Sequence, residues 1–278
     1  MAGNEREELG GIDDQRGVVT PASFRDFWRN PAMIIAAHKE LLRVRGEPLV
    51  ERLGESPLTI RISTPVITMD SQIEIPGTSH IEGNLRIIAE RDALYRMYIY
   101  GDRTTGEEHI ALIRSVGDGT NVPIRVHSSC ITAETFHATN CDCHEQLGKA
   151  LDITDREGFG GVIWLHQEGR GNGLTGKAQQ LTIMSEQGVD TVEAFQRAGY
   201  PVDQRDYTIA ADILRDLGIT SIRLITNNPD KIEQLTKAGI TVIDRIPCET
   251  APLSEVARKD LDAKRSKLGH QISVVELG

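Results

Sequence analysis

Three of the four cysteines in this chain lie close together, at Cys130, Cys141 and Cys143. Thiolates are soft ligands that suit tetrahedral zinc, and three of them leave one coordination position open to water, as in catalytic zinc sites. Zinc in such a site can supply hydroxide near neutral pH. The chain has no Cys-x-x-Cys pair, so it does not fit the zinc deaminases. We therefore predict a zinc site made by these three cysteines.

Two other interpretations of the cysteines stay open at the level of sequence. Free cysteines are often buried core residues, so the grouping can arise by chance. A structural zinc site would instead be closed by a fourth protein ligand, and its coordination would decide between the two kinds of site. The candidates for that fourth ligand are Cys248, His127 and His144.

A glycine-rich segment, residues 167–177, follows an apolar run that is typical of a buried strand. Glycines allow the backbone to approach a ligand closely, which suits phosphate binding. The part from Gly171 to Lys177 matches Gly-x-x-x-x-Gly-Lys, but Ala178 stands where a P-loop has the Ser or Thr that holds magnesium. A P-loop is therefore disfavoured, and a structural glycine turn is the alternative to a ligand-binding loop.

Two further polar segments follow predicted elements, where binding and catalytic residues often gather. They are residues 203–206 (Asp-Gln-Arg-Asp) and residues 226–231. Each is weak by itself, because Asp203 and Arg205 can form an exposed ion pair and Lys231 can be a solvated residue at a helix start. Their combination with the cysteines favours an enzyme.

The hydrophobic pattern and the turn residues predict an α/β fold of the mixed α+β kind, in which helices flank a mixed sheet. In the first half we predict an amphipathic helix, then short or edge strands, then antiparallel strands, at residues 21–45, 58–73, 85–89, 95–100 and 109–114. In the second half we predict helices and strands at residues 146–156, 161–166, 206–217, 221–226, from Asn228-Pro229 onward, and 240–244. Residues 1–80 are expected to form an N-terminal extension that begins with a mobile tail, and residues 81–278 the catalytic domain.

Length and composition narrow the class of protein. With 278 residues, of which 39% are hydrophobic, the chain can form a core without disulfides. Its net charge of −10 argues against a nucleic-acid surface, which needs clustered lysine and arginine. No apolar run approaches the roughly 18 residues of a membrane span, and the acidic start is unlike a signal peptide. We expect a cytoplasmic protein with reduced thiols that binds neither nucleic acid nor membrane.

Taken in chain order, the motifs resemble those of GTP cyclohydrolase II. They are the three cysteines, Gln167-Glu168-Gly169-Arg170, Asp190-Thr191-Val192-Glu193-Ala194, Asp203-x-Arg205-Asp206 and Thr226-Asn227-Asn228-Pro229. The resemblance runs from about residue 106 to residue 270. The first eighty residues contain no recognisable dihydroxybutanone-phosphate synthase domain.

The resemblance implies a zinc hydrolase that opens the imidazole ring of a nucleotide substrate, GTP, with loss of formate and pyrophosphate at the entrance to riboflavin biosynthesis. One Zn²⁺ per chain would be held by the three cysteines, Mg²⁺ would accompany the triphosphate, and the protein would form a homodimer. In this family Arg205 would be the nucleophile at the α-phosphate and Asp203 the general base. Because arginine is normally protonated, stabilising phosphoryl charge is the physically easier role for Arg205. The positions that would bind substrate are Arg125, His127, Gln146, Glu168, Gly169, Arg170, Thr191, Thr226 and Lys231.

The sequence departs from the family pattern at two places. The family usually carries a tyrosine four residues after the lysine that matches Lys177, whereas this chain has Leu181 there, or Thr182 if the alignment shifts by one. A tyrosine hydroxyl can donate to a developing oxyanion or relay a proton, so we expect at least one hydrolytic step to be impaired, with arrest at the formamidopyrimidine stage. Ser129 stands where the family has glutamate beside the first cysteine, and residues 171–173 replace a bulkier turn, so recognition of the base can differ.

Two alternative functions follow from the same residues. The first keeps the zinc and the ring opening but changes the base, for example to a pyrimidine nucleotide, as in relatives associated with uracil degradation. The second is a catalytically silent nucleotide-binding or zinc-stabilised interaction protein, in which a fourth protein ligand closes the zinc site. A panel of substrates tests the first alternative, and the coordination of the metal tests the second.

Overall fold

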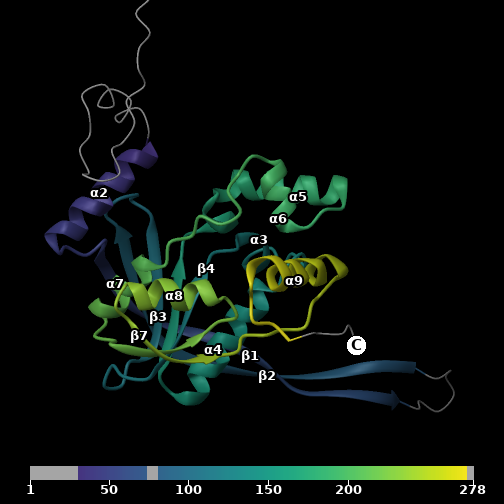
Figure 1. Ribbon diagram of the computed structural model, residues 1–278. Helices are drawn as coiled ribbons and strands as arrows, with labels where there is room; N and C mark the ends of the chain where they lie inside the picture. The colour runs from purple at the N-terminus through teal and green to yellow at the C-terminus, as the bar shows by residue number, and fades with distance from the viewer. Residues whose placement is uncertain (1–30, 74–80, 274–278) are drawn as a thin grey trace, which may run out of the picture.

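The computed structural model describes residues 31–73 and 81–273, and within them seven strands form one mixed sheet in the order β1-β2-β3-β5-β4-β6-β7 (Figure 1). The strands are Val50–Ile73 (β1), Ile81–Asp102 (β2), Glu108–Ser115 (β3), Val122–Ser128 (β4), Gly160–Leu165 (β5), Ser221–Ile225 (β6) and Thr241–Ile246 (β7). The helices are Pro31–Arg45 (α2), Ile131–Glu134 (α3), Cys143–Glu157 (α4), Glu168–Gly171 (η1, a 3-10 turn), Gly173–Gln187 (α5), Thr191–Arg197 (α6), Thr208–Asp216 (α7), Pro229–Lys237 (α8) and Glu255–Leu268 (α9). The predicted mixed α/β fold is confirmed.

The first half of the sheet is antiparallel and contains an unusually long hairpin. Strands β1 and β2 pair from Val50 opposite Asp102 to Ile73 opposite Ile81, and they extend well beyond the rest of the sheet (Figure 1). The prediction of short strands in residues 58–73 was therefore wrong, although β1 is an edge strand as expected. The two strands predicted at residues 85–89 and 95–100 are likewise parts of the single strand β2. Pro65 does not end β1, because an edge strand with a register shift tolerates a residue without an N–H donor.

The second half of the sheet is parallel and is covered by helices on both faces. In β4, which lies between β5 and β6, every residue before Ser128 is buried. Side chains alternate between the faces of a strand, so Ile124 and Val126 join the large core cluster with α7, while Val162 of β5 packs on the other face with Ala150 of α4. Both faces of this half of the sheet are therefore apolar cores.

Most of the predicted elements of the second half are confirmed within two or three residues, as β5, α4, α7, β6, α8 and β7. Asn228 is the N-cap of α8 and its side chain accepts a hydrogen bond of 3.0 Å from the Asp230 N–H, with Pro229 in the first turn as expected. Strand β4 and helices α5, α6 and α9 were not predicted. In the first half, α2 confirms the later part of the helix predicted at residues 21–45, whereas its beginning and the predicted mobile tail lie outside the described residues. In the part of the chain that the structure describes, no helix is long and apolar enough to cross a membrane.

Candidate metal centre and active site

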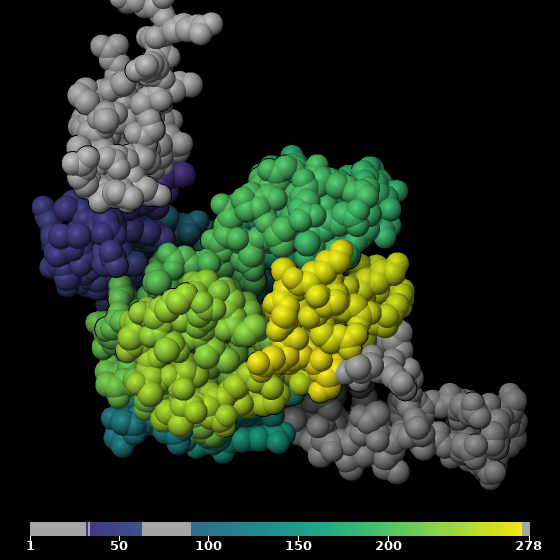
Figure 2. Space-filling model, in the orientation of Figure 1, coloured from purple at the N-terminus to yellow at the C-terminus, as the bar shows by residue number. Residues whose placement is uncertain are grey.

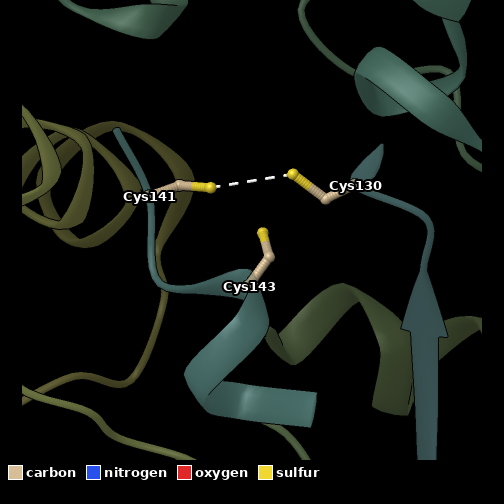
Figure 3. A group of neighbouring side chains, drawn as sticks. All are labelled: Cys130, Cys141 and Cys143. Carbon is tan, nitrogen blue, oxygen red and sulfur yellow. Dashed lines mark hydrogen bonds between the residues drawn. The ribbon is translucent and has the colours of Figure 1, made fainter. Parts of the chain in front are cut away.

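The three cysteines come from segments that surround the end of β4. Cys130 follows this strand and precedes α3, Cys141 lies in the next loop, and Cys143 is the first residue of α4. Their sulfur atoms all lie within 4.8 Å of one another, with 3.7 Å between Cys130 and Cys141, and Figure 3 shows the three side chains pointing toward a common centre. A tetrahedral zinc ion with bonds of about 2.3 Å separates its sulfur ligands by about 3.8 Å. The donor set and its spacing therefore fit zinc.

The charges of the thiols indicate that a cation belongs between them. Hydrogen bonds from the thiols of Cys141 and Cys143 lower the pKa of Cys130, and the Lys177 ammonium adds to this effect. The same hydrogen bonding to Cys130 raises the pKa of Cys141 to about 12 and holds that of Cys143 above its ordinary value. One thiolate thus forms readily and disfavours the next two, because like charges at this distance repel. A divalent cation would remove that repulsion and allow all three to ionise.

The three candidates for a fourth protein ligand do not belong to the cysteine cluster in the described part of the chain. The thiol of Cys248 is buried and donates to the carbonyl of Gln146 at 3.6 Å. The Nε2 of His127 lies 3.0 Å from Glu134, and the ring of His144 packs edge-on against that of His137. None of these three candidates would therefore fill the fourth position of a metal held by the three thiols.

A cavity of about 150 Å³ opens at the cysteine cluster and collects many of the predicted site residues. The predicted residues that line it are Cys130, Cys141, Cys143, Glu168, Gly169, Arg170, Thr191 and Arg205. The predicted residues that do not line it are Asp203, Arg125, His127, Gln146, Thr226 and Lys231.

The glycine-rich segment forms the wall of the cavity opposite α4. Gly169 and Arg170 both have positive φ, 59° and 57°, and a non-glycine residue in this conformation is strained and is often found at functional sites. The turn directs Glu168 back toward the cysteines, where its carboxylate accepts 2.7 Å hydrogen bonds from the N–H of Ile131 and from Lys177 Nζ. In this way the loop after β5 is tied to the start of α3.

Cationic side chains surround the cavity. Lys177 Nζ donates to the sulfur of Cys130 at 3.0 Å. Burial lowers the pKa of this ammonium, but the Cys130 thiolate and Glu168 outweigh burial and raise it. Arg170 Nη1 is buried without a hydrogen-bond partner among the described residues, and Arg205 and Lys264 also line the cavity. This arrangement favours an anionic ligand.

Asp203 and Arg205 form the ion pair that the sequence allowed. Arg205 Nε donates to Asp203 Oδ1 at 2.9 Å, and a second bond joins Nη2 to the other carboxylate oxygen. Burial lowers the pKa of Arg205, but Tyr207 and Asp203 outweigh burial and raise it. The guanidinium is thus held charged, which suits the stabilisation of phosphoryl charge better than nucleophilic attack.

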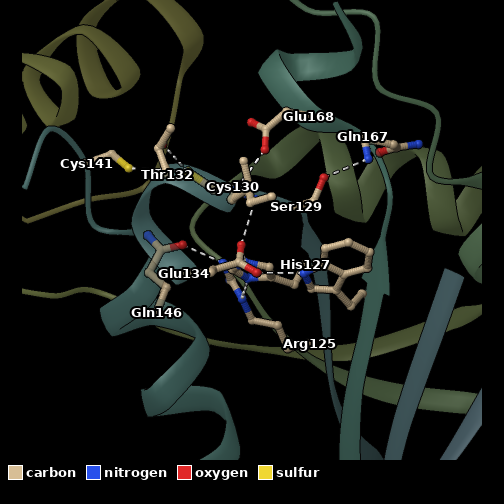
Figure 4. Close-up of polar contacts among 12 residues, drawn as sticks. Arg125, His127, Ser129, Cys130, Thr132, Glu134, Cys141, Gln146, Gln167 and Glu168 are labelled. Atoms are coloured by element: carbon tan, nitrogen blue, oxygen red, sulfur yellow. Dashed lines mark hydrogen bonds and ion pairs between the residues drawn. The ribbon is translucent and has the colours of Figure 1, made fainter. Parts of the chain in front are cut away.

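Three of the remaining predicted residues, Arg125, His127 and Gln146, are joined by hydrogen bonds outside the cavity lining (Figure 4). Arg125 donates to His127 Nδ1 at 3.2 Å, to the carbonyl of Ile225 at 3.1 Å, and to the side chain of Gln146. Lys231 donates to the carbonyl of Val126 at 2.7 Å. These polar groups are partnered because an unpaired charge inside the protein is costly. Their predicted contact with substrate stays a prediction.

The position of the missing tyrosine is now defined in space. Leu181 lies on α5 one helical turn after Lys177 and lines the cavity. Thr182 is exposed, and its hydroxyl donates to the carbonyl of Ala178 at 3.1 Å. Of the two candidate positions, Leu181 is therefore the one whose side chain lines the cavity.

Sequence reasoning missed several residues of the site. Glu134 accepts hydrogen bonds from the N–H of Cys130 and from Trp164 Nε1, each at 2.7 Å, and its position four residues after Cys130 was the only available signal. The others come from α5, α6, α9 and the residues after α9, and they are Gln180, Met184, Phe195, Asp260, Lys264 and His270. Asp260 and Lys264 stand four apart in a charged helix, a pattern that usually indicates a solvated ion pair.

A second cavity, of about 420 Å³, adjoins the first and shares Gln167 and Glu168 with it. Its walls carry His109 and the carboxylates of Asp102, Glu107 and Asp206. Such an acidic lining repels a triphosphate, so the cationic cavity at the cysteines is the better candidate for an anionic substrate.

Three thiols whose spacing fits a divalent cation lie in a cavity bordered by lysine and arginine, as is expected of a site where a metal and an anionic ligand meet. Comparison with known proteins gives the family. The sequence model of the family GTP cyclohydrolase II matches residues 85–247, which is more than half of the chain. The chain therefore belongs to the GTP cyclohydrolase II family.

Two curated relatives of the chain carry riboflavin biosynthesis in their names. The chain is 41% identical over 179 residues to the riboflavin biosynthesis protein RibBA of Phocaeicola vulgatus, covering 64% of this chain and 44% of the relative. It is 34% identical over 262 residues to the probable bifunctional riboflavin biosynthesis protein RIBA 1, chloroplastic, of Oryza sativa subsp. japonica, covering 93% of this chain and 43% of the relative. The chain thus spans less than half the length of these curated relatives.

Among solved structures, the chain is similar to RibBX, a two-domain 3,4-dihydroxy-2-butanone 4-phosphate synthase from A. baumannii. The TM-score is 0.29 and the identity 15%, over 77% of this chain and 46% of that chain. A likeness this low carries no argument about the site or the fold.

Proposed function

We propose that this chain is a zinc-dependent cyclohydrolase that opens the imidazole ring of a purine nucleotide, with GTP as its substrate. The observation that supports this most directly is the group of three thiols in a cavity that is also lined by Arg170 and the charged Arg205. A zinc ion bound by these thiols would lower the pKa of a coordinated water and so supply hydroxide near neutral pH.

The residues of the chain divide the remaining work between them. Arg170 and Arg205 bind and orient the phosphates, and Mg²⁺ accompanies the triphosphate. Asp203 holds Arg205 in place through two hydrogen bonds, so that the guanidinium meets charge developing at the α-phosphate. Lys177 lies between Cys130 and Glu168 and can hold a proton within reach of the leaving formate.

Leu181 determines how far the reaction goes. Its side chain can neither donate a hydrogen bond nor move a proton. We infer that ring opening occurs but that release of formate is slow, so the formamidopyrimidine nucleotide accumulates. We also infer a homodimer that works in a reducing compartment such as the cytoplasm, where the four free thiols stay reduced.

The test is an assay of the zinc-loaded protein with GTP that measures three quantities separately, namely the purine absorbance, formate and pyrophosphate. Loss of purine absorbance with little formate is the expected result. Unchanged GTP would overturn the proposal for this substrate, and a parallel panel of pyrimidine nucleotides shows whether the base is the error. Cys141→Ser should abolish turnover, whereas Cys248→Ser, outside the cluster, should retain it.

A further inference from the structure

Helix α9 follows residues 85–247, the part of the chain that the sequence model of the family matches, and it forms part of the candidate site. It packs beside α6, and Figure 2 shows its yellow surface next to the green surface of α5 and α6. Asp260 and Lys264 of this helix line the cavity at the cysteines, together with His270 just after it. The wall that this helix supplies therefore belongs to the site.

Lys264 connects α9 to the residue between two of the cysteines. Its Nζ lies 3.0 Å from Asp142 Oδ1 and 2.7 Å from Asp260 Oδ2, and the side chain is largely buried. Asp142 stands between Cys141 and Cys143 and is 1% exposed. The ammonium thus bridges a carboxylate of its own helix and a carboxylate of the cysteine segment.

The Asp142 carboxylate is held from three directions. Oδ1 accepts from Lys264, while Oδ2 accepts from Thr250 Oγ1 at 3.0 Å and from Gln146 Nε2. A buried carboxylate needs such partners, and Lys264 is the one that carries a positive charge. With Asp142 fixed in this way, the backbone that carries the sulfurs of Cys141 and Cys143 is fixed too.

We propose that Lys264 is a positioning residue for the metal centre, which holds Cys141 and Cys143 in register with Cys130 by anchoring Asp142 to α9. The expected change in zinc affinity rests on the proposed function. The expected ordering of the segment from Cys141 to Cys143 does not, because it can be measured in the metal-free chain. Removing a residue that positions metal ligands without contacting the metal commonly lowers the metal affinity by roughly 10- to 100-fold.

The first experiment measures zinc affinity of the full chain by competition with a chromogenic chelator. Lys264→Met should weaken zinc binding by roughly 10- to 100-fold. The matched control is Lys259→Met, an exposed lysine of the same helix, which should bind zinc as the unchanged chain does. The double variant Asp142→Asn, Lys264→Met removes both charges of this pair, and Asp260 keeps Arg170 as a cationic neighbour at 3.7 Å, so the double variant should lose less than the two single losses added together.

The second experiment works without metal and separates this inference from the proposed function. In the metal-free protein, Lys264→Met should make Cys141 and Cys143 react several-fold faster with an alkylating reagent, read by mass spectrometry of the peptides, while Lys259→Met leaves the rates unchanged. If the unchanged chain binds no zinc but Lys264→Met still accelerates alkylation, the metal function fails and the positioning role stands. If Lys264→Met alters neither zinc affinity nor alkylation while circular dichroism shows a folded chain, the positioning role is wrong.

Discussion

Leu181 is the single residue on which the extent of the proposed reaction depends. It lines the cavity from α5, on the same face of the helix as Lys177, whose ammonium touches the Cys130 sulfur. A tyrosine at this position would bring a hydroxyl into a cavity where protons must be moved. The neighbouring Thr182 is exposed and cannot take over this role.

We predict that Leu181→Tyr raises the rate of formate release from GTP by roughly ten-fold or more, because a positioned proton donor is worth at least that much in acid–base catalysis. Formate and pyrophosphate are measured separately. A change in the binding of GTP would alter the release of both products, whereas the added hydroxyl should raise the release of formate alone. Thr182→Tyr places the same phenol on the exposed side and should leave formate release unchanged. Equal formate release by both variants and the unchanged chain would show that the hydroxyl is not what the site lacks.

Residue types alone do not tell which of the predicted substrate-binding residues line the cavity. Arg125, His127 and Lys231 are not among the residues that line it, and they bond instead to neighbouring side chains and backbone carbonyls, so their contact with substrate stays a prediction. Their types are right for a nucleotide site, but type alone does not tell which face of a strand or helix points to the cavity. By contrast, the clustering of Cys130, Cys141 and Cys143 was predictable, because three thiols at short sequence spacing are typical of a zinc site.

At the scale of elements, the ends of β3 and β5 place an imidazole in a buried position. His109 is 1% exposed, and its Nδ1 accepts a 3.1 Å hydrogen bond from the N–H of His166. Its Nε2 has no hydrogen-bond partner in the described part of the chain. Burial lowers the pKa of His109 to about 4, against an ordinary value of 6.5. The folded protein therefore keeps this ring neutral at pH values at which the unfolded chain protonates it.

This difference predicts a loss of stability in mild acid. Above pH 6.5 neither state binds the proton and the full stability is present; as the pH falls from 6.5 toward 4, only the unfolded chain takes it up, and the free energy of unfolding decreases. At pH 5 the loss due to His109 should be about 2 kcal/mol. Urea unfolding of the unchanged chain and of His109→Gln, at pH 7.5 and pH 5 with a chelator present, measures it as the difference between the two pH dependences. Identical pH dependences would contradict the assignment.

Helices and strands were predicted correctly where apolar residues dominate a segment. They were missed where polar residues or proline stand among the apolar ones. Residues 161–166 contain a continuous apolar run and residues 221–226 place apolar residues at Ile222, Leu224 and Ile225, and both segments are strands. Strand β4 was missed because Pro123, Arg125 and His127 interrupt its apolar pattern, although the central strand of a covered sheet buries even these side chains. The long β1–β2 hairpin was divided into short pieces because Pro65 looked like an end, and pairing between distant strands overrode that local signal.

At the scale of the whole molecule, a metal would add a link between segments that packing, hydrogen bonds and the Lys264–Asp142 ion pair already hold together. It would link the end of β4 to the start of α4, and through Asp142 to α9 near the end of the described chain. An ion that binds the folded state and not the unfolded state stabilises the fold by mass action, by about 4 kcal/mol when its free concentration is a thousand times its dissociation constant.

We predict that chelation of zinc lowers the melting temperature by roughly 10 °C at pH 7.5, since about 2–4 °C corresponds to 1 kcal/mol in a chain of this size. Differential scanning calorimetry with and without chelator measures the shift. Cys141→Ser should melt at the chelated temperature whether or not chelator is present. Cys248→Ala, whose thiol lies outside the cluster, should keep the full chelator effect. A chelator effect of the same size in both variants would contradict the three-thiol site.

The sequence by itself determined the family, the chemistry of the three thiols and most elements of the parallel half of the sheet, because motifs and apolar runs are local properties. Only the tertiary structure decided that Leu181 rather than Thr182 meets the cavity, since that depends on how α5 is rotated against the sheet. It also decided that Lys264 of α9 reaches Asp142, a contact between residues far apart in the chain. Such contacts arise from packing of whole elements, and spacing along the chain carries no record of them.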